Sequence, residues 1–356
     1  MYKALVIGAG SIGNHLTHAC RTKGWSVDMY DIDSAALLRT RDEIYPARYG
    51  SWDNEIRLLS EENYAPQYDV AIIGTPPDSH LSVATDLLKR TNITCLLLEK
   101  PLCSPSLEGL SAFQRELEKA QCEAIVGYNH IFTANTLRAE NVLRQHDFGM
   151  PLSMHVRWLE HWGGIFAAHP WLAGPADSYL GHWSKGGGAC GEHSHAISLW
   201  QHFSNVVDMG RIDTVSCSMK MIEQSQVNYD QTAQLLVRST KGLNGSIIQD
   251  VVTAPAEKMM RIQFENGSLQ WNANIDDSHD SIEYRVGAIE PEVEYFEKTR
   301  PDDFVGQMSH IEAILEGAID AKDSPNRLDE GISTMKVVSA AHSAHRHASV
   351  VKVSTI

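Results

Sequence analysis

The sequence lacks any apolar run long enough for a membrane-spanning helix. No stretch approaches the roughly 18 consecutive apolar residues that such a helix requires. Residues 1–6 lead directly into a strand pattern and not into the charged-then-apolar layout of a signal peptide. We therefore expect a cytoplasmic protein with no membrane partner.

Basic residues are scarce relative to acidic ones. The chain has 30 Lys and Arg residues against 45 Asp and Glu residues, a formal net charge of −15. A surface of this sign repels nucleic-acid phosphates and anionic lipids. Closely spaced cysteines are also missing, because the six Cys residues are scattered without a C-x-x-C pair. We expect reduced thiols, no disulfide framework and no nucleic-acid partner.

Up to residue 127, short apolar runs alternate with helical patterns. Asp33 before Ser34 is typical of a helix N-cap. The alternation is typical of βαβ units around a parallel sheet, so residues 1–127 are predicted to form an α/β Rossmann domain. The expected strands are 3–8, 26–31, 69–74, 95–99 and 124–127, and the expected helices are 12–23, 78–90 and 105–119.

The pattern changes after about residue 150, where strand-like runs dominate. Asn266-Gly267 marks a hairpin turn. Residues 128–356 are predicted to form an α+β domain with a large, mainly antiparallel sheet that binds substrate and supports a homo-oligomer. Its final helices are expected to pack back toward the Rossmann domain. The expected strands are 151–159, 213–221, 231–238, 244–252, 258–265, 268–273 and 281–286, and the expected helices are 191–203, 303–320 and 328–346.

A glycine-rich motif follows the first strand. Gly8-Ala9-Gly10-Ser11-Ile12-Gly13 matches G-x-G-x-x-G between a strand and a helix, the context in which this motif binds a dinucleotide. Gly8 permits the tight turn, Gly10 lets the backbone approach the pyrophosphate, and Gly13 allows close packing of helix on strand. The N–H groups at Ser11 and Ile12, where the helix begins, are expected to face the phosphates.

Asp31 ends the second strand, at the distance from the glycine motif where a carboxylate binds the adenosine ribose. It would also repel the 2′-phosphate of NADP, and the next residue is Ile32 rather than an arginine. Asp33 could serve in place of Asp31. The predicted cofactor is NAD, with Asp31 and Ile32 at its adenosine end, and NADP is less suited.

Polar residues follow three neighbouring strands of the predicted sheet. Ligands bind beyond the carboxyl ends of parallel strands, so these residues should line a cofactor crevice. A lysine followed directly by proline at this edge, Lys100-Pro101, is not easily explained as a solvent-facing charge. The residues expected to contact the cofactor are Thr75, Pro76, His80, Glu99, Lys100 and Asn129, and those expected to contact substrate are Lys100 and Tyr128.

In order and spacing, these motifs resemble the glucose–fructose oxidoreductase/inositol dehydrogenase family (Gfo/Idh/MocA). Glu99-Lys100-Pro101 is the most specific part, and the resemblance covers essentially the whole chain. Gly186-Gly187-Gly188 and the later Glu192-His193-Ser194-His195 look like that family's second-domain active-site helix. The resemblance implies that Lys100 polarises the reacting oxygen, that His195 is the catalytic histidine, and that the Lys100–Pro101 bond is cis.

The sequence departs from the family pattern around His195. Many members carry Asp four residues before this histidine and three residues after it, where this chain has Gly191 and Ser198. Glu192, on the same predicted helix face as His195, could orient the imidazole instead. The chain resembles a subgroup with Glu-Leu-Ser-His here, associated with amino- and deoxysugar pathways, with His193 replacing Leu.

Tryptophan and histidine concentrate between residues 150 and 205. Trp158 and Trp200 are interpreted as core residues, whereas Trp162 and Trp183 lie among Gly, Pro and His in a loop. Aromatic faces stack on sugar rings, so Trp162, Trp183 and His182 are expected to bind substrate together with Lys100 and His195.

A metal site is an alternative for the same region. Potential ligands cluster there, but their spacing does not present them on one helix face, so no metal is expected. These residues are His169, His182, Cys190, Glu192, His193 and His195.

Oxidation of a secondary alcohol needs a base for the hydroxyl proton while a hydride leaves the carbon. Imidazole titrates near working pH, which suits His195 to that task, and the Lys100 ammonium would stabilise the developing alkoxide. We therefore predict an NAD(H)-dependent oxidoreductase that interconverts a secondary alcohol and a ketone on a sugar, nucleotide sugar or cyclitol. Two alternatives stay open: a glycosidase that uses NAD for transient oxidation and elimination, and a dinucleotide-binding regulator without catalysis.

Overall fold

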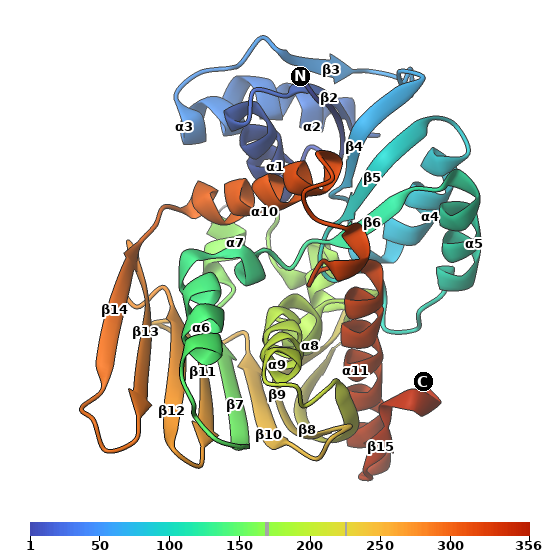
Figure 1. Cartoon of the computed structure of the whole chain (residues 1–356). Coiled ribbons are helices and arrows are strands. Elements are labelled where there is room, and N and C mark those ends of the chain that lie inside the picture. Colours follow the sequence, from blue (N-terminus) through green and yellow to red (C-terminus); the bar gives the residue numbers. More distant parts are fainter. Residues whose placement is uncertain (168–170, 225) are drawn as a thin grey trace. The chain divides into compact units, whose positions relative to one another are not determined.

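The computed structural model describes residues 1–167, 171–224 and 226–356, which form two compact units (Figure 1). The first unit contains Met1–Cys103, Leu107–Asn129 and Arg300–Asp329. The second contains Ser104–Ser106, His130–Thr299 and Glu330–Ile356. The main passage from the first to the second lies between residues 129 and 130, beside the boundary expected at 127/128. Residues 300–329, which were assigned by sequence to the second domain with its final helices packing back toward the first, belong to the first unit.

The first unit is built on a six-stranded sheet in which every neighbouring pair is parallel. The strand order is β3-β2-β1-β4-β5-β6, so the winding direction reverses between β1 and β4. Ligands bind outside the carboxyl ends of strands at such a reversal. The strands are β1 (Lys3–Ile7), β2 (Ser26–Tyr30), β3 (Ile56–Leu59), β4 (Gln67–Ile73), β5 (Asn92–Leu98) and β6 (Glu123–Val126). The predicted Rossmann sheet is confirmed, and β3 is an additional edge strand.

Helices alternate with these strands as predicted, with local differences. Asp33 is the N-cap of its helix and accepts a hydrogen bond from the Ala35 N–H. The helix expected from residue 105 begins only at Leu110, because Leu107 and Gly109 have positive φ angles that interrupt helical geometry. The helices are α1 (Ser11–Thr22), α2 (Ser34–Arg39), the π-helical η1 (Thr40–Ile44), α3 (Tyr45–Tyr49), α4 (Pro77–Leu88), α5 (Leu110–Ala120) and α10 (Arg300–Leu315).

Helix α10 packs against α1 within the first unit. The Phe304 ring stacks on His15 at 4.9 Å between ring centres, and the sulfur atoms of Cys20 and Met308 are 3.6 Å apart. A segment 288 residues distant in sequence, counted from Cys20 to Met308, thereby covers the helix that follows the glycine-rich motif.

The second unit contains, among its described residues, a nine-stranded sheet of order β14-β13-β12-β11-β7-β10-β9-β8-β15. All neighbouring pairs are antiparallel except β7 with β10, which confirms the predicted mainly antiparallel sheet. Phe264 pairs with Gly267 across the turn at Asn266, as the hairpin signal indicated. The strands are β7 (Pro151–Leu159), β8 (Ile212–Gln224), β9 (Val227–Ser239), β10 (Asn244–Asp250), β11 (Glu257–Phe264), β12 (Gly267–Ala273), β13 (His279–Val286), β14 (Glu292–Glu297) and β15 (Val351–Lys352).

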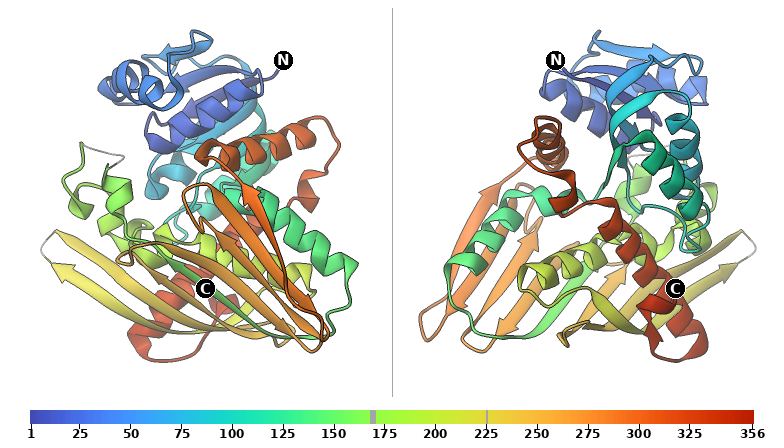
Figure 2. Two further views of the ribbon diagram at one scale, coloured as in Figure 1. Left: turned by 90° about the vertical axis from the view of Figure 1, so that its left-hand side faces the viewer. Right: turned by 45° about the vertical axis from the view of Figure 1, so that its right-hand side comes forward.

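Helices α6, α9 and α11 cover one face of this sheet (Figures 1 and 2). Val156 and Trp158 on β7 and Met260 on β11 point toward that face and are buried. Along both strands, such buried residues alternate with residues that are more exposed. None of the helices in the described residues is long and apolar enough to span a membrane. The helices are α6 (Ala134–Gln145), α7 (Gly163–Ala167), α8 (Gly188–Glu192), α9 (His195–Val206) and α11 (Leu328–His347).

A buried carboxylate links β9 to α8 and α11 in this unit. Asp230 is fully buried, and its Oδ2 accepts a hydrogen bond of 2.7 Å from the Cys190 N–H in α8. Its Oδ1 lies 3.7 Å from Nε2 of His342 in α11. Burial raises the pKa of Asp230 to about 7 and lowers the pKa of His342 to about 3.

We expect Asp230→Asn to change how stability depends on pH. Between its ordinary pKa of 3.8 and about 7, the folded chain holds a proton on Asp230 that the unfolded chain has released. The free energy of unfolding contributed by this group therefore falls as pH rises through that window, by at most about 4 kcal/mol. Asn avoids the burial of a charge and can still accept the Cys190 hydrogen bond.

Urea unfolding of both proteins between pH 5 and pH 8 measures this effect. The stability of Asp230→Asn relative to the unsubstituted chain should increase with pH. Asp208→Asn is the matched control, because the Asp208 side chain is 92% exposed and pairs with Lys241 at the surface. Parallel pH profiles for Asp230→Asn and the unsubstituted chain would contradict the account.

Candidate functional site

The glycine-rich motif forms a turn in which each glycine meets a different constraint. Gly8 has φ +109°, and a Cβ there would lie 2.7 Å from the Gly74 carbonyl oxygen. A Cβ on Gly13 would lie 1.9 Å from the Gly8 carbonyl oxygen, so no other residue fits. A Cβ on Gly10 would meet nothing within 4 Å. Gly8 and Gly13 thus permit backbone packing, and Gly10 keeps open the space through which a pyrophosphate approaches the loop.

Asp31 holds this turn against the end of β2. Its Oδ2 accepts a hydrogen bond of 2.7 Å from the Ala9 N–H, and its Oδ1 accepts one of 2.9 Å from the Asp33 N–H. Asp33 caps α2 instead of facing the turn, which leaves Asp31 as the carboxylate beside the glycine motif. The adjacent Ile32 is 93% exposed. The residues present therefore fit a dinucleotide with its ribose at Asp31.

His80, which was predicted to contact the cofactor, is held between two backbone carbonyl groups. Its ring is fully buried, with Nε2 2.6 Å from the Thr75 carbonyl oxygen and Nδ1 3.2 Å from that of Leu102. Burial lowers the pKa of His80, so the ring is neutral and has a single N–H to donate. His80 instead ties the loop after β4 to the loop after β5. It thereby positions Thr75, which is half-buried, and Pro76, which is exposed.

Lys100 follows β5 and is half-buried. Its backbone N–H donates a 3.2 Å hydrogen bond to the buried carboxylate of Glu99, and its bond to Pro101 is cis, as the resemblance implied. Gly127 at the end of β6 accommodates this carboxylate, since a Cβ there would lie 2.4 Å from Glu99 Oε1. Glu99 therefore fixes the backbone that carries Lys100, and the sequence motif did not reveal its partner Gly127.

The loop after β6 is positioned by a residue that sequence reasoning missed. Asn326 donates a 2.8 Å hydrogen bond to the Tyr128 carbonyl, and its own carbonyl accepts one of 2.8 Å from the Val126 N–H. Tyr128 is 1% exposed and Asn129 is 7% exposed, so both predicted contact residues are buried in this structure. No local signal could identify Asn326, because it lies 198 residues from Tyr128.

In the second unit, the single helix expected over 191–203 is two helices. α8 ends at Glu192 and α9 begins at His195. The side-chain amide of Gln249 in β10 donates to the carbonyl oxygen of His193, which lies at the break, with a distance of 2.6 Å. The proposed common helix face of Glu192 and His195 is therefore wrong. Glu192 instead accepts a 2.7 Å hydrogen bond from the Tyr179 hydroxyl.

Gly187, directly before α8, and Gly188 and Gly191 within it allow this helix to approach its neighbours closely. A Cβ on Gly187 would lie 2.1 Å from the Tyr179 carbonyl oxygen, and one on Gly188 would lie 2.0 Å from Asp230 Oδ1. A Cβ on Gly191 would lie 2.2 Å from the Gly186 carbonyl oxygen. The departure from the family aspartate at residue 191 thus has a local reason, since only glycine fits there.

His195 lies in a cluster of aromatic rings at the start of α9. Its imidazole stacks on Trp158 at 5.4 Å between centres and meets His130 edge-on at 4.8 Å. Lys258 lies 5.4 Å from the centre of the Trp158 ring and forms a 2.8 Å ion pair with Glu160. Neither His130 nor Lys258 was among the predicted site residues. The rings fix the orientation of the imidazole, as a proton-transfer group requires.

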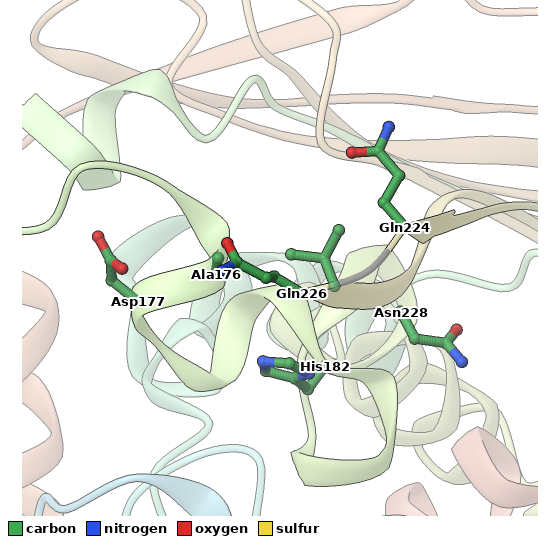
Figure 3. Close-up of a pocket in the computed structure, with 7 residues that line it drawn as sticks. Ala176, Asp177, His182, Gln224, Gln226 and Asn228 are labelled. Atoms are coloured by element: carbon green, nitrogen blue, oxygen red, sulfur yellow. The ribbon is translucent and has the colours of Figure 1, made fainter.

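The predicted sugar-binding residues occupy three different environments. Trp162 is 8% exposed and packs on Tyr229, with 4.9 Å between ring centres, so it lies in a small hydrophobic core in this structure. Trp183 stacks on His342 at 4.4 Å. His182 lines a polar cavity of about 520 Å³ (Figure 3). The other lining residues are Ala176, Asp177, Gln224, Gln226, Val227 and Asn228.

Metal binding receives no support from the described part of the chain. None of its His, Cys, Asp and Glu side chains form a group of three that could hold a metal ion. Cys190 is fully buried, which raises the pKa of its thiol well above the ordinary value and disfavours a metal-binding thiolate. His169, named as a potential ligand, lies outside the described residues.

Three comparisons with known proteins bear on this arrangement. Residues 2–128 match the model of an oxidoreductase family with an NAD-binding Rossmann fold, Gfo/Idh/MocA. The search of curated proteins found no significant match to the chain.

Solved structures share the fold over nearly the whole chain. The WlbA dehydrogenase from Bordetella pertussis, in complex with NADH and UDP-GlcNAcA, is 17% identical with a TM-score of 0.72, covering 99% of this chain and 98% of that one. Levoglucosan dehydrogenase, in complex with NADH and levoglucosan, is 16% identical with a TM-score of 0.75, covering 100% of both chains. A super-repressor mutant of Gal80p from Saccharomyces cerevisiae is 12% identical with a TM-score of 0.77, covering 99% and 98%.

These findings agree with the glycine turn, the parallel sheet and the antiparallel sheet described above. Residues 2–128 match the NAD-binding Rossmann domain of the Gfo/Idh/MocA oxidoreductase family, and the chain as a whole has the two-domain fold of those enzymes.

Proposed function

We propose that this protein is an NAD(H)-dependent oxidoreductase that interconverts a secondary alcohol and a ketone on a sugar, nucleotide sugar or cyclitol. The observation that carries the proposal is Lys100, which follows β5 in a domain that matches an NAD-binding oxidoreductase family. In such a sheet the carboxyl ends of the strands face the bound ligand. Two structural neighbours that were solved with NADH and a sugar ligand support the substrate class.

In this proposal Lys100 and His195 divide the chemistry. Bound NAD would accept the hydride from the substrate carbon. The Lys100 ammonium would stabilise negative charge on the reacting oxygen, and the His195 imidazole would take the hydroxyl proton. Glu99 holds the Lys100 backbone, and Trp158 and His130 hold the imidazole ring. Glu192, held by Tyr179, is proposed as a positioning residue for the segment that carries His195.

Substrate binding is proposed for the cavity around His182. Its polar lining residues offer one carboxylate, three amides and an imidazole, which suit the hydroxyl groups of a sugar. Trp183 and Tyr128 remain proposed contacts, and Trp162 is better explained as a core residue that supports this region.

Two other functions fit parts of the same evidence. A glycosidase that oxidises its substrate transiently would use the same residues but would not accumulate NADH. A regulator is the second, because the super-repressor mutant of Gal80p has a similar fold and a fold does not determine function. Retention of both Lys100 and His195 favours an enzyme, because a sensor has no need of a proton-transfer pair.

The proposed chemistry predicts large losses of turnover on substitution of either residue. Lys100→Met and His195→Ala should each lower kcat by at least about 100-fold, because each removes a positioned catalytic group. NADH affinity should change little. The double variant should lose less than the product of the single losses, since both groups act on one oxygen.

Steady-state kinetics and fluorescence titration with NADH separate these effects. Lys89→Met and His155→Ala are matched controls, because both side chains are exposed on other parts of the chain. Full activity in Lys100→Met would overturn the mechanism. Full activity in His195→Ala would transfer the proton-transfer role to another residue.

Asp31 is expected to set the preference for NAD over NADP. The double substitution Asp31→Ser/Ile32→Arg should weaken NAD binding and improve NADP use, since it removes the ribose carboxylate and adds a cation for the 2′-phosphate. Binding constants for both cofactors measure this change. Equal affinity of the unsubstituted protein for NAD and NADP would contradict the assignment of Asp31.

His182→Ala tests the proposed substrate cavity. Loss of one hydrogen bond to a hydroxyl group should raise KM by about fivefold, with little change in NADH affinity. His279→Ala, an imidazole on β13 outside the cavity, serves as the control. An unchanged KM in His182→Ala would remove this cavity from the substrate site.

A further inference from the structure

An arginine from α3 reaches the glycine-rich motif. The Arg48 guanidinium donates hydrogen bonds of 2.8 Å to the Ser11 hydroxyl and 3.1 Å to the Ser11 carbonyl oxygen. Ser11 is the residue directly after Gly10 and is 7% exposed. The cation is therefore anchored one residue from the open space above Gly10.

A second arginine lies beside the same end of α1. Arg300, the first residue of α10, donates a 3.3 Å hydrogen bond to Nε2 of His15. The other ring nitrogen, Nδ1, lies 2.6 Å from the Tyr49 hydroxyl. Burial, followed by the charges of Arg300 and Arg48, lowers the pKa of His15 to about 3. His15 is thus a neutral acceptor for Arg300. The charges of Arg300 and Arg48 both act on this ring.

Both guanidinium groups are bonded only to neutral acceptors. Within the described part of the chain, neither Arg48 nor Arg300 has a carboxylate partner. This is unusual in a chain that carries a net charge of −15, where acidic partners outnumber basic ones. A half-buried arginine without a counter-ion is costly unless an anion joins it. Desolvation and the charge of Arg300 both lower the pKa of Arg48, in line with this.

We propose that Arg48, supported by Arg300, binds the pyrophosphate of the dinucleotide through the Ser11 side of the glycine turn. The turn itself offers only backbone N–H groups and a helix N-terminus to the phosphates. Arg48 would add a charge-assisted hydrogen bond and hold the Ser11 hydroxyl toward the same anion. The inference depends on NAD binding at this turn, and a wild-type protein that binds no NADH would refute both together.

The adenosine 2′-phosphate of NADP is the competing anion. It is disfavoured here because the Asp31 carboxylate occupies the ribose end of the turn, held by the Ala9 N–H. A pyrophosphate is common to NADH, NADPH and ADP-ribose, whereas adenosine lacks it. These four probes therefore distinguish the two sources of negative charge.

The test compares the affinities of the full chain and its variants for these probes. Arg48→Gln should lower the affinities for NADH, NADPH and ADP-ribose by a common factor of about tenfold, as expected for loss of one charge-assisted hydrogen bond. The affinity for adenosine should not change. Binding to the unsubstituted chain should also weaken more steeply with salt than binding to the variant. Arg41→Gln is the matched control, because Arg41 lies in η1, directly before α3, and is paired with Asp42 at the surface.

Arg300→Gln is a second test variant, and its side chain is exposed. It should lower the affinities for the three pyrophosphate-containing probes by about threefold, because its charge is farther from Ser11. An unchanged affinity for ADP-ribose in whichever of the two variants folds overturns the proposal. A loss confined to NADPH also overturns it, because the arginine would then serve a 2′-phosphate.

Discussion

The contact between the backbones of Gly8 and Gly13 is the constraint on which the cofactor domain depends. A single Cβ on Gly13 would come within 1.9 Å of the Gly8 carbonyl oxygen, so α1 can start where it does only without that atom. The position of α1 then determines where its N–H groups, the open space at Gly10 and the Ser11 hydroxyl lie. Asp31 and Arg48 both contact this turn, one from the residue directly after β2 and the other from α3.

The second unit uses the same physical device for a different purpose. Three glycines let α8 approach Tyr179, Asp230 and the preceding turn more closely than any side chain would permit. The buried Asp230 carboxylate accepts the Cys190 N–H, and Gln249 binds the carbonyl oxygen at the break after Glu192. His195 begins the next helix with its ring held by Trp158. A rigid backbone thus orients the imidazole that we propose as the proton acceptor.

Local patterns were sufficient to predict the parts of the fold that depend on local physics. The G-x-G-x-x-G motif, the Asp33 cap and the Asn266 turn act through neighbouring residues, and all three have the predicted structure. The alternation of strands and helices likewise predicted the parallel sheet, and the later strand-like runs predicted the antiparallel one.

The surroundings of the site residues depend on contacts between different segments, which local patterns could not predict. His80 is of a residue type that often binds ligands, but its ring lies between the backbone carbonyl groups of Thr75 and Leu102. The break between α8 and α9 is held by Gln249, 56 residues beyond His193. Trp162 is enclosed by Tyr229 and Val251 from strands and loops that follow it by more than 60 residues. No spacing rule within a segment carries this information.

Hydride transfer is the central claim, and isotope transfer tests it most directly. The protein would be incubated with NADH deuterated at the reacting carbon of the nicotinamide and with the ketone forms of free sugars, nucleotide-linked sugars and inositols. The account predicts that deuterium appears on a carbon of the alcohol product as NADH absorbance falls. Tight NADH binding without deuterium transfer to any of these classes would contradict it and favour a dinucleotide-binding regulator.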